Sequence, residues 1–283
     1  MRISLKDVKR KSAEGRFFKY DSFNDKLFVP VAVVFMWLFA NMGFSGNTVT
    51  WISGYFSILG GILLASDNGI LIFLGSFSYV MFYLLDYTDG GVARLRKESG
   101  IEGQYVDWIM HLISTTAIST GIFIGAFRSI GDFWIVPFGV LFVVASALLH
   151  GHVAFGWWSV CMYHQQNKVN KNVVHYDRSC PEDGGKSKFF KCVKYTSLLL
   201  FHGNYAIYVL PLLSLINVIF RKQGLKLVDF RCVLTVLGGT LFFLHTVHET
   251  MKISKFRKLQ RAYAKLFVSN ETPDLPKEHF FFH

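Results

Sequence analysis

Four side chains that can bind a cation lie close together in the segment DYTDGGVARLRKESGIEGQYVDWIMH, residues 86–111. Three are the carboxylates of Asp86, Asp89 and Asp107, and the fourth is the imidazole of His111. Residues three or four positions apart lie on one face of a helix. The spacing therefore places Asp86 and Asp89 on one face of a first helix, and Asp107 and His111 on one face of a second.

These residue types together indicate a site for a divalent cation and phosphate. Three neighbouring carboxylates repel one another, and a divalent cation relieves that repulsion. Aspartate oxygens, completed by water and by phosphates of a substrate, suit Mg²⁺ or Mn²⁺. Arg94 carries a guanidinium, which binds phosphate well. The alternative is that the charges only cap two helices at a membrane boundary, but the shared spacing of the whole set favours a functional site.

Small residues accompany the charged ones on both predicted helices. Gly90 and Ala93 lie on the face of Asp86 and Asp89, and Gly103 lies on the face of Asp107. Small residues allow a second helix or a ligand to approach the backbone closely. The intervening segment, residues 95–102, is a loop that can fold the second helix back against the first. We therefore expect the three carboxylates and the imidazole to converge.

The composition indicates that a membrane positions these helices. Of the 283 residues, 52% are hydrophobic and 17% are charged, whereas soluble domains average nearer a quarter charged. Several apolar runs reach or approach the roughly 20 residues that a helix needs to cross a bilayer. They are residues 27–43, 49–66, 69–85, 103–127, 133–160, 193–220 and 227–250. The sequence therefore predicts an all-α, multi-pass membrane protein.

The distribution of cations predicts the orientation. The net charge is +11, and of the 30 lysines and arginines eight lie in residues 1–26 and seven in residues 251–283. Cations beside apolar spans are typical of cytosolic segments and of contact with anionic lipids. The chain shows no basic stripe on a soluble domain, so nucleic acid is excluded as a partner. We expect an integral membrane protein whose site faces the cytosol, in the inner membrane if the source is bacterial.

Counting the crossings divides the chain into three parts. If residues 49–66 leave the cytosol, then the segment 86–102, the loop 161–191 and the C-terminal tail all return to it. Six core transmembrane helices then occupy residues 46–250. Residues 1–45 form a basic arm and an extra N-terminal helix. Because the arm carries eight cations and should also be cytosolic, the run 27–43 cannot be a simple single crossing and is expected to be interfacial or re-entrant. Residues 251–283 have apolar residues at helical spacing opposite lysines and arginines, which predicts an amphipathic tail.

The spacing of the charged and small residues closely resembles one family. The CDP-alcohol phosphotransferases share the pattern D-x2-D-G-x2-A-R-x8-G-x3-D-x3-D, and this chain matches it from Asp86 to Asp107. The segment GNTVT, residues 46–50, is similar to the family's P-N-x-(I/V)-T at the start of the first core span, with Gly46 in place of the proline. The resemblance covers residues 45–115 in sequence and is architectural elsewhere.

The resemblance implies a reaction. Such enzymes bind a CDP-linked donor on the cytosolic face, and an alcohol hydroxyl attacks the β-phosphorus and releases CMP. Mg²⁺ or Mn²⁺ would be held by Asp86, Asp89 and Asp107, with His111 at the remaining position. Catalysis would involve His111 and Asp107. Donor binding would involve Asn47, Thr50, Asp86, Asp89, Gly90, Ala93, Arg94 and Gly103. The implied partners are the CDP-linked alcohol, an alcohol or lipid acceptor, membrane lipids and a second copy in a homodimer.

His111 departs from the family pattern, which has an aspartate at this position that acts as general base. Histidine can do the same work, since its unperturbed pKa is about 6.5, and it can also ligate a metal. Three hypotheses follow: His111 replaces the base, or the base lies elsewhere and His111 positions acceptor or metal, or the activity is altered or lost. Among the remaining histidines, His248 beside Glu249 is the best placed to join the site.

Two pairs of donor and acceptor are compatible with the family resemblance. The segment YDSFNDKLFVP, residues 20–30, resembles the lead-in of choline and ethanolamine phosphotransferases, which favours transfer of a small phospho-alcohol onto a lipid. Phosphatidyl transfer from CDP-diacylglycerol to a polar alcohol is the alternative. A divalent-cation transporter is the contrasting class, but it predicts acids deep in several spans rather than at one end. An inactive homologue is the remaining alternative.

Overall fold

The computed structural model of the chain describes residues 3–13, 23–98, 100–170, 193, 196, 203–222 and 229–255. These residues form helices and no strand. The elements are α1 (Leu5–Ala13), α2 (Phe23–Met42), α3 (Gly46–Leu64), α4 (Gly69–Arg96), α5 (Ile101–Ile130), a short 3₁₀ helix η1 (Phe133–Ile135), α6 (Val136–Asn170), α8 (Gly203–Lys222) and α9 (Phe230–Lys255). The predicted all-α architecture is confirmed.

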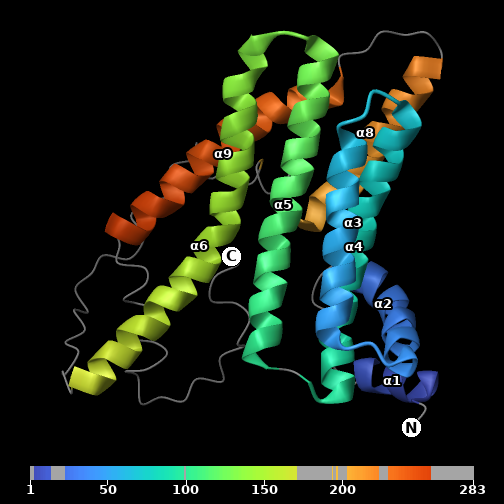
Figure 1. Cartoon of the computed structure of the whole chain (residues 1–283), viewed down its shortest axis with the longest axis vertical. Coiled ribbons are helices and arrows are strands. Elements are labelled where there is room, and N and C mark those ends of the chain that lie inside the picture. Colours follow the sequence, from blue (N-terminus) through green and yellow to red (C-terminus); the bar gives the residue numbers. More distant parts are fainter. Residues whose placement is uncertain are drawn as a thin grey trace.

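Six of these helices are long and apolar enough to cross a membrane. They contain the segments Asn24–Met42, Gly46–Leu64, Gly69–Arg96, Glu102–Ile130, Phe133–Gly151 and Phe230–Met251. The apolar part of α8, Ala206–Phe220, is shorter. Together with the exposed leucines, valines and aromatic residues along their outer faces, these helices identify the protein as a multi-pass membrane helix bundle (Figure 1).

The bundle has two ends. We call the end that carries the segment 86–111 the motif end, and the other the opposite end. At the motif end, α3 begins at Gly46, α4 ends at Arg96 and α5 begins at Ile101. At the opposite end, residues 65–68 connect α3 to α4, and residues 131–135 connect α5 to α6 (Figure 1). The Asn68 side chain caps α4 by accepting a hydrogen bond from the Ile70 amide, and Lys97 ends α4 with a left-handed φ of 60°. The loop predicted at residues 95–102 is shorter than expected, because α4 continues to Arg96 and α5 begins at Ile101. The loop between the two site helices is therefore tight.

Helix α2 lies beside the motif end. Phe28 packs against Tyr83 and Tyr87 of α4, and a Cβ on Gly91, two turns from Tyr83, would overlap the Met36 side chain. The partners of α2 thus lie in the motif half of α4, as Figure 1 also shows. This position agrees with the predicted extra N-terminal helix. The helix is longer than the run 27–43, and by length and composition it could cross a membrane.

The predicted loop 161–191 begins later than expected. Residues 161–170 continue α6 to Asn170, because the segment CMYHQQNKVN lacks glycine and proline and contains residues with good helix propensity. The rest of that loop and the predicted amphipathic tail beyond residue 255 lie outside the described residues.

Helices α3 and α5 approach so closely that only glycine fits at their contact. A Cβ added to Gly121 would overlap the carbonyl oxygen of Gly61, and a Cβ added to Gly61 would overlap the carbonyl oxygen of Ala117. Close backbone approach through small residues is the usual way for helices to associate in a bilayer. This contact holds α5 against α3 and so sets the position of Asp107 and His111 at its motif end.

Replacing Gly121 by valine is expected to destabilise the bundle by about 1–3 kcal/mol or more, because the added side chain forces the two helices apart. The thermal midpoint of the detergent-solubilised protein measures the effect. Gly151→Ala is the matched control: a Cβ there meets only the ring of Phe155, at 3.1 Å, and that ring is exposed. Equal stability of the two variants would show that the α3–α5 contact is not this tight.

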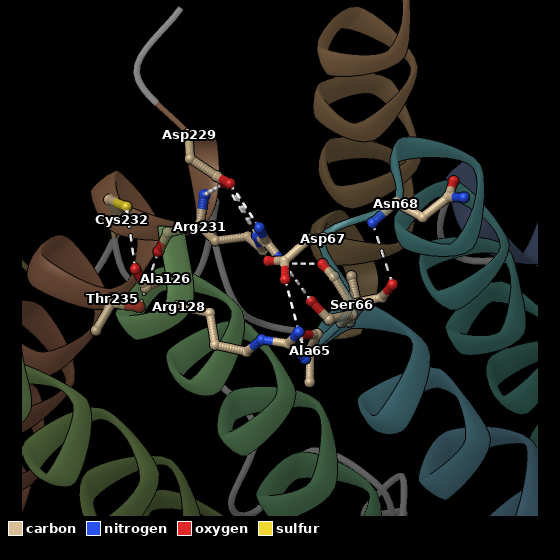
Figure 2. A network of polar contacts seen from close by, with 11 residues as sticks. Ala65, Ser66, Asp67, Asn68, Ala126, Arg128, Asp229, Arg231, Cys232 and Thr235 are labelled. Carbon is tan, nitrogen blue, oxygen red and sulfur yellow. Dashed lines mark hydrogen bonds and ion pairs between the residues drawn. The ribbon is translucent and has the colours of Figure 1, made fainter. Parts of the chain in front are cut away.

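At the opposite end, a buried arginine that is paired with Asp229 at the start of α9 also bonds to the end of α3 (Figure 2). Arg231, with 0% of its surface exposed, donates to both carboxylate oxygens of Asp229 and, through Nη1, to the carbonyl oxygens of Leu64 and Ser66 at 2.7 and 2.6 Å. Burial alone would raise the pKa of the Asp229 carboxyl, but the hydrogen bonds and charge of Arg231 outweigh it, so this pKa is lowered. The end of α3 is therefore fixed against the start of α9.

Candidate metal and phosphate site

The motif ends of α4 and α5 bring three of the predicted ligands into one compact group. Ligand atoms of Asp86, Asp107 and His111 all lie within 4.8 Å of one another. The His111 Nε2 atom is 3.0 Å from Asp86 Oδ1 and 3.5 Å from Asp107 Oδ1. These side chains are between 21% and 37% exposed, so they lie at a surface that a substrate can reach. The predicted convergence of two helices is confirmed.

Asp89 takes a different place from the other carboxylates. It is buried, and the hydroxyl of Thr50, on α3, donates to its Oδ2 atom at 2.6 Å. Its Oδ1 atom contacts the amide of Gly90. The sequence predicted Asp89 as a fourth ligand of one metal, whereas the structure directs its side chain toward α3. Thr50, predicted for donor binding, is therefore a partner of Asp89.

The small residues of the motif lie where helices meet. A Cβ on Gly46 would lie 2.6 Å from the Cβ of Ala93, so the start of α3 packs directly on α4. In this structure the contact leaves no room for a side chain at position 46. Likewise, a Cβ on Gly103 would be 3.3 Å from the Asn47 Oδ1 atom. Asn47 therefore lies at the junction of α3 and α5.

Arg94 lies on the same side of α4 as Gly90. Its Nη1 atom would be 3.4 Å from a Cβ at position 90, so the guanidinium folds back over the glycine. The lack of a side chain at position 90 therefore leaves room for a cationic group directly beside the backbone of α4. This arrangement suits a phosphate oxygen, which guanidinium binds through paired hydrogen bonds.

His150 is a site residue that the sequence did not assign. Its ring, on α6, stacks on His111 with centroids 6.3 Å apart, and Phe82 meets the His111 ring edge-on at 5.7 Å. The Nδ1 atom of His150 lies 3.3 Å from the Thr115 hydroxyl, which donates to the His111 carbonyl oxygen. The sequence favoured His248, whereas among the residues that the structure describes a ring contact with His111 is found for His150. A polar residue within an apolar run was its only signal.

Tyrosines connect the site to α2 and α8. The hydroxyl of Tyr87 donates to Asp25 Oδ1, and the hydroxyl of Tyr208, on α8, donates to Asn24 Oδ1, both at 2.8 Å. Tyr87 directly follows Asp86, so its bond to Asp25 ties the helix turn that carries the Asp86 carboxylate to α2, and the bond of Tyr208 ties α8 to α2. The lead-in segment around residues 20–30 therefore has a structural role beside the site.

The donor set fits a divalent cation. Two carboxylates and one imidazole at the end of two helices provide the mixed oxygen and nitrogen ligands that Mn²⁺ and Zn²⁺ accept and that Mg²⁺ accepts less readily. The partial exposure leaves room for water or phosphate oxygens to complete the coordination. The group can therefore bind a metal and an anionic substrate together.

No protein-family model matches the chain, and no curated protein matches it. The function is inferred from the site itself.

Proposed function

We propose that the protein is a CDP-alcohol phosphotransferase, which transfers a substituted phosphate group from a CDP-linked alcohol to an alcohol acceptor and releases CMP. The observation that carries the proposal is the compact group of Asp86, Asp107 and His111, which lies beside Asp89 and Arg94 in the residue order and spacing of that family. A lone metal site would not need the guanidinium over Gly90.

Each group has a task in this reaction. Asp86, Asp107 and His111 would hold Mg²⁺ or Mn²⁺, which when bound neutralises phosphate charge and supports the leaving nucleotide. Arg94 binds a donor phosphate, and Gly90 leaves room for its guanidinium beside α4. Thr50 holds Asp89 in place, and Asn47 and Gly103 close the junction next to it. Transfer places the acceptor hydroxyl against the β-phosphorus.

The choline and ethanolamine type of donor is favoured over CDP-diacylglycerol. The lead-in segment that resembles those enzymes contributes Asn24 and Asp25, which bond to Tyr208 and Tyr87 beside the site. A role in phospholipid synthesis follows, with the motif end in the cytosol because most cations flank that end. The acceptor would be a membrane lipid alcohol.

Release of CMP from a panel of donors tests the proposal. Purified protein in lipid nanodiscs would be supplied with CDP-choline, CDP-ethanolamine or CDP-diacylglycerol and with radiolabelled acceptor. We expect CMP and labelled lipid to appear together with one donor, in the presence of Mn²⁺ or Mg²⁺ and not of a chelator. Absence of CMP release with every donor and both metals would refute the proposal.

His111 is expected to be essential for turnover. His111→Ala removes a ligand atom and the imidazole that lies 3.0 Å from Asp86, so we expect a loss of about 10²-fold to 10⁴-fold in the rate of CMP release. His111→Asp restores the family pattern and should retain turnover. The rates of both variants, compared with wild type across pH 5–9, distinguish a base from a ligand. Retained turnover in His111→Ala would eliminate the hypothesis that His111 replaces the base.

A further inference from the structure

Helices α6 and α9 enclose a groove of about 600 Å³ on the outer side of their contact. The two helices meet tightly at Gly239, where a Cβ would overlap the carbonyl oxygen of Phe138. One turn nearer the motif end, the rings of Phe142 and Phe242 pack at 5.8 Å. Beyond these contacts the helices separate, and Figure 1 shows α9 running obliquely to α6. The groove is therefore closed toward the opposite end and extends toward the motif end.

The groove is distinct from the candidate site. Val144 and Leu148 line it, whereas Ser146 and His150, on another face of α6, bond to Ser119 and Thr115 of α5. Helix α6 thus separates the groove from His111. A ligand of the groove does not contact the metal-binding group.

In a membrane-embedded bundle, the groove would face the bilayer. Its lining residues belong to the segments Phe133–Gly151 and Phe230–Met251, both long and apolar enough to cross a membrane. They are apolar apart from two threonines, and Val144, Leu148 and Met251 are 49%, 47% and 58% exposed. The volume lies within the range of small-molecule sites. The occupant therefore comes from the lipid phase and is largely hydrocarbon.

One polar group in the wall, the Thr246 hydroxyl, indicates which atoms of a lipid the groove accepts. Three threonines of α9, at positions 235, 240 and 250, donate to the carbonyl oxygen four residues earlier. Thr246 lines the groove and is 7% exposed, and its hydroxyl has no hydrogen-bond partner among the described residues. An unpaired hydroxyl at membrane depth is costly. Threonine in a helix has two accessible χ1 rotamers, so this hydroxyl can turn to an acceptor in the groove.

We propose that this groove binds an ester-linked acyl chain of a glycerolipid, with the Thr246 hydroxyl donating to the ester carbonyl oxygen. An ester carbonyl is the acceptor that accompanies an acyl chain in a bilayer, and the hydrocarbon below it covers the apolar wall. The polar head then lies toward the motif end, where His248 and Glu249 lie 3.9 Å apart on α9. This binding does not depend on the proposed transfer activity.

Photolabelling with a bilayer lipid tests the groove itself. The full-length protein would be placed in nanodiscs of diester phosphatidylcholine containing a trace of the same lipid with a diazirine in one acyl chain. Label on α6 and α9 peptides would be measured by mass spectrometry. Val144→Phe fills the groove, so its label should fall about tenfold, because several methylene groups lose their burial. Val140→Phe is the matched control, since Val140 is on the same helix, is similarly exposed at 51% and does not line the groove.

The ester contact has its own test. Thr246→Val keeps the shape and removes the hydroxyl, so labelling by the diester probe should fall about threefold to tenfold, while labelling by a diether probe should not change. Thr240→Val controls for loss of a threonine whose hydroxyl is bonded within α9. Equal labelling of Val144→Phe and Val140→Phe would overturn the proposal, and an equal loss with diester and diether probes would overturn the role of Thr246.

A second copy of the chain is the competing occupant. It predicts that Val144→Phe shifts the molecular mass in detergent, measured by light scattering, and leaves lipid labelling unchanged. That result would overturn the lipid assignment. An unchanged mass together with the loss of label supports it.

Discussion

Replacing Asp86 by asparagine should reduce CMP release about a thousandfold and weaken binding of Mn²⁺ to the same protein. Of the two carboxylates in the ligand group, Asp86 is the nearer to His111, at 3.0 Å. Its loss would remove one charge from the proposed cation site, and a bound metal would contribute several kcal/mol to stabilising phosphate charge, at 1.36 kcal/mol for each factor of ten in rate. The carboxylate is 21% exposed, so the amide is tolerated by the fold.

Asp67→Asn is the matched control for this experiment. Asp67 lies at the opposite end of the bundle, where its carboxylate pairs with Arg128 at 2.6 Å and is 54% exposed. Rate and Mn²⁺ affinity, the latter followed by electron paramagnetic resonance, should match wild type in this variant. If Asp86→Asn bound Mn²⁺ as wild type does, the metal site would have been assigned to the wrong residues. If metal binding fell and CMP release did not, the metal would have no part in turnover.

Arg231→Met is expected to lower the free energy of unfolding by about 3–5 kcal/mol, the cost of leaving a buried charge without its partner. The guanidinium is fully buried and satisfies Asp229 and two carbonyl oxygens at the end of α3 (Figure 2). Gly125 on α5 makes room for it, since a Cβ there would overlap Nη1. Methionine keeps much of the volume and none of the hydrogen bonds. Thermal and denaturant unfolding in detergent measure the loss.

Arg128→Met provides the comparison at the same end of the bundle. Arg128 pairs with Asp67, but both side chains are about half exposed, at 53% and 54%, so the expected cost is about 0–1 kcal/mol. The double change Asp229→Leu with Arg231→Met removes both charges and should recover part of the loss. Similar midpoints for Arg128→Met and Arg231→Met would show that the buried pair does not hold α9 to α3.

The dependence on pH provides a further check of this pair. The pKa of Asp229 is lowered in the folded protein, so the pair adds stability above the usual carboxyl pKa and loses it as the pH falls through the lowered value. Wild type should therefore lose stability in acid, and Arg231→Met should lose less over the same range. An identical acid dependence in both proteins would contradict the pairing.

The site could be predicted from the sequence where its residues are local. Asp86 and Asp89 are three apart on one helix, and Asp107 and His111 are four apart on another, so helical spacing alone groups each pair. The short connection between the helices then requires the two pairs to meet. The apolar runs predicted the same helices, because a bilayer needs a long apolar segment for every crossing.

Residues that join the site across long distances in sequence could not be predicted in this way. His150 reaches His111 only because α6 packs on α5 through Ser119 and Ser146, and nothing in the run LLHGHV specifies that partner. Asp89 has the same spacing as Asp86, yet the contact between Gly46 and Ala93 brings α3 close enough for Thr50 to bind its carboxylate. Helix packing, rather than the local sequence pattern, therefore gives these two aspartates different partners.

By itself, the sequence determined that the protein is a helical membrane bundle with a cluster of carboxylates and an imidazole at one end, because hydropathy and helical periodicity are properties of neighbouring residues. Only the tertiary structure decided which of those side chains form one ligand group, which histidine stacks on His111, where Arg231 is buried, and that α6 and α9 enclose a groove with an unpaired threonine. These features depend on the angles and distances at which helices far apart in the chain pack, and glycine contacts and buried polar bonds set those angles.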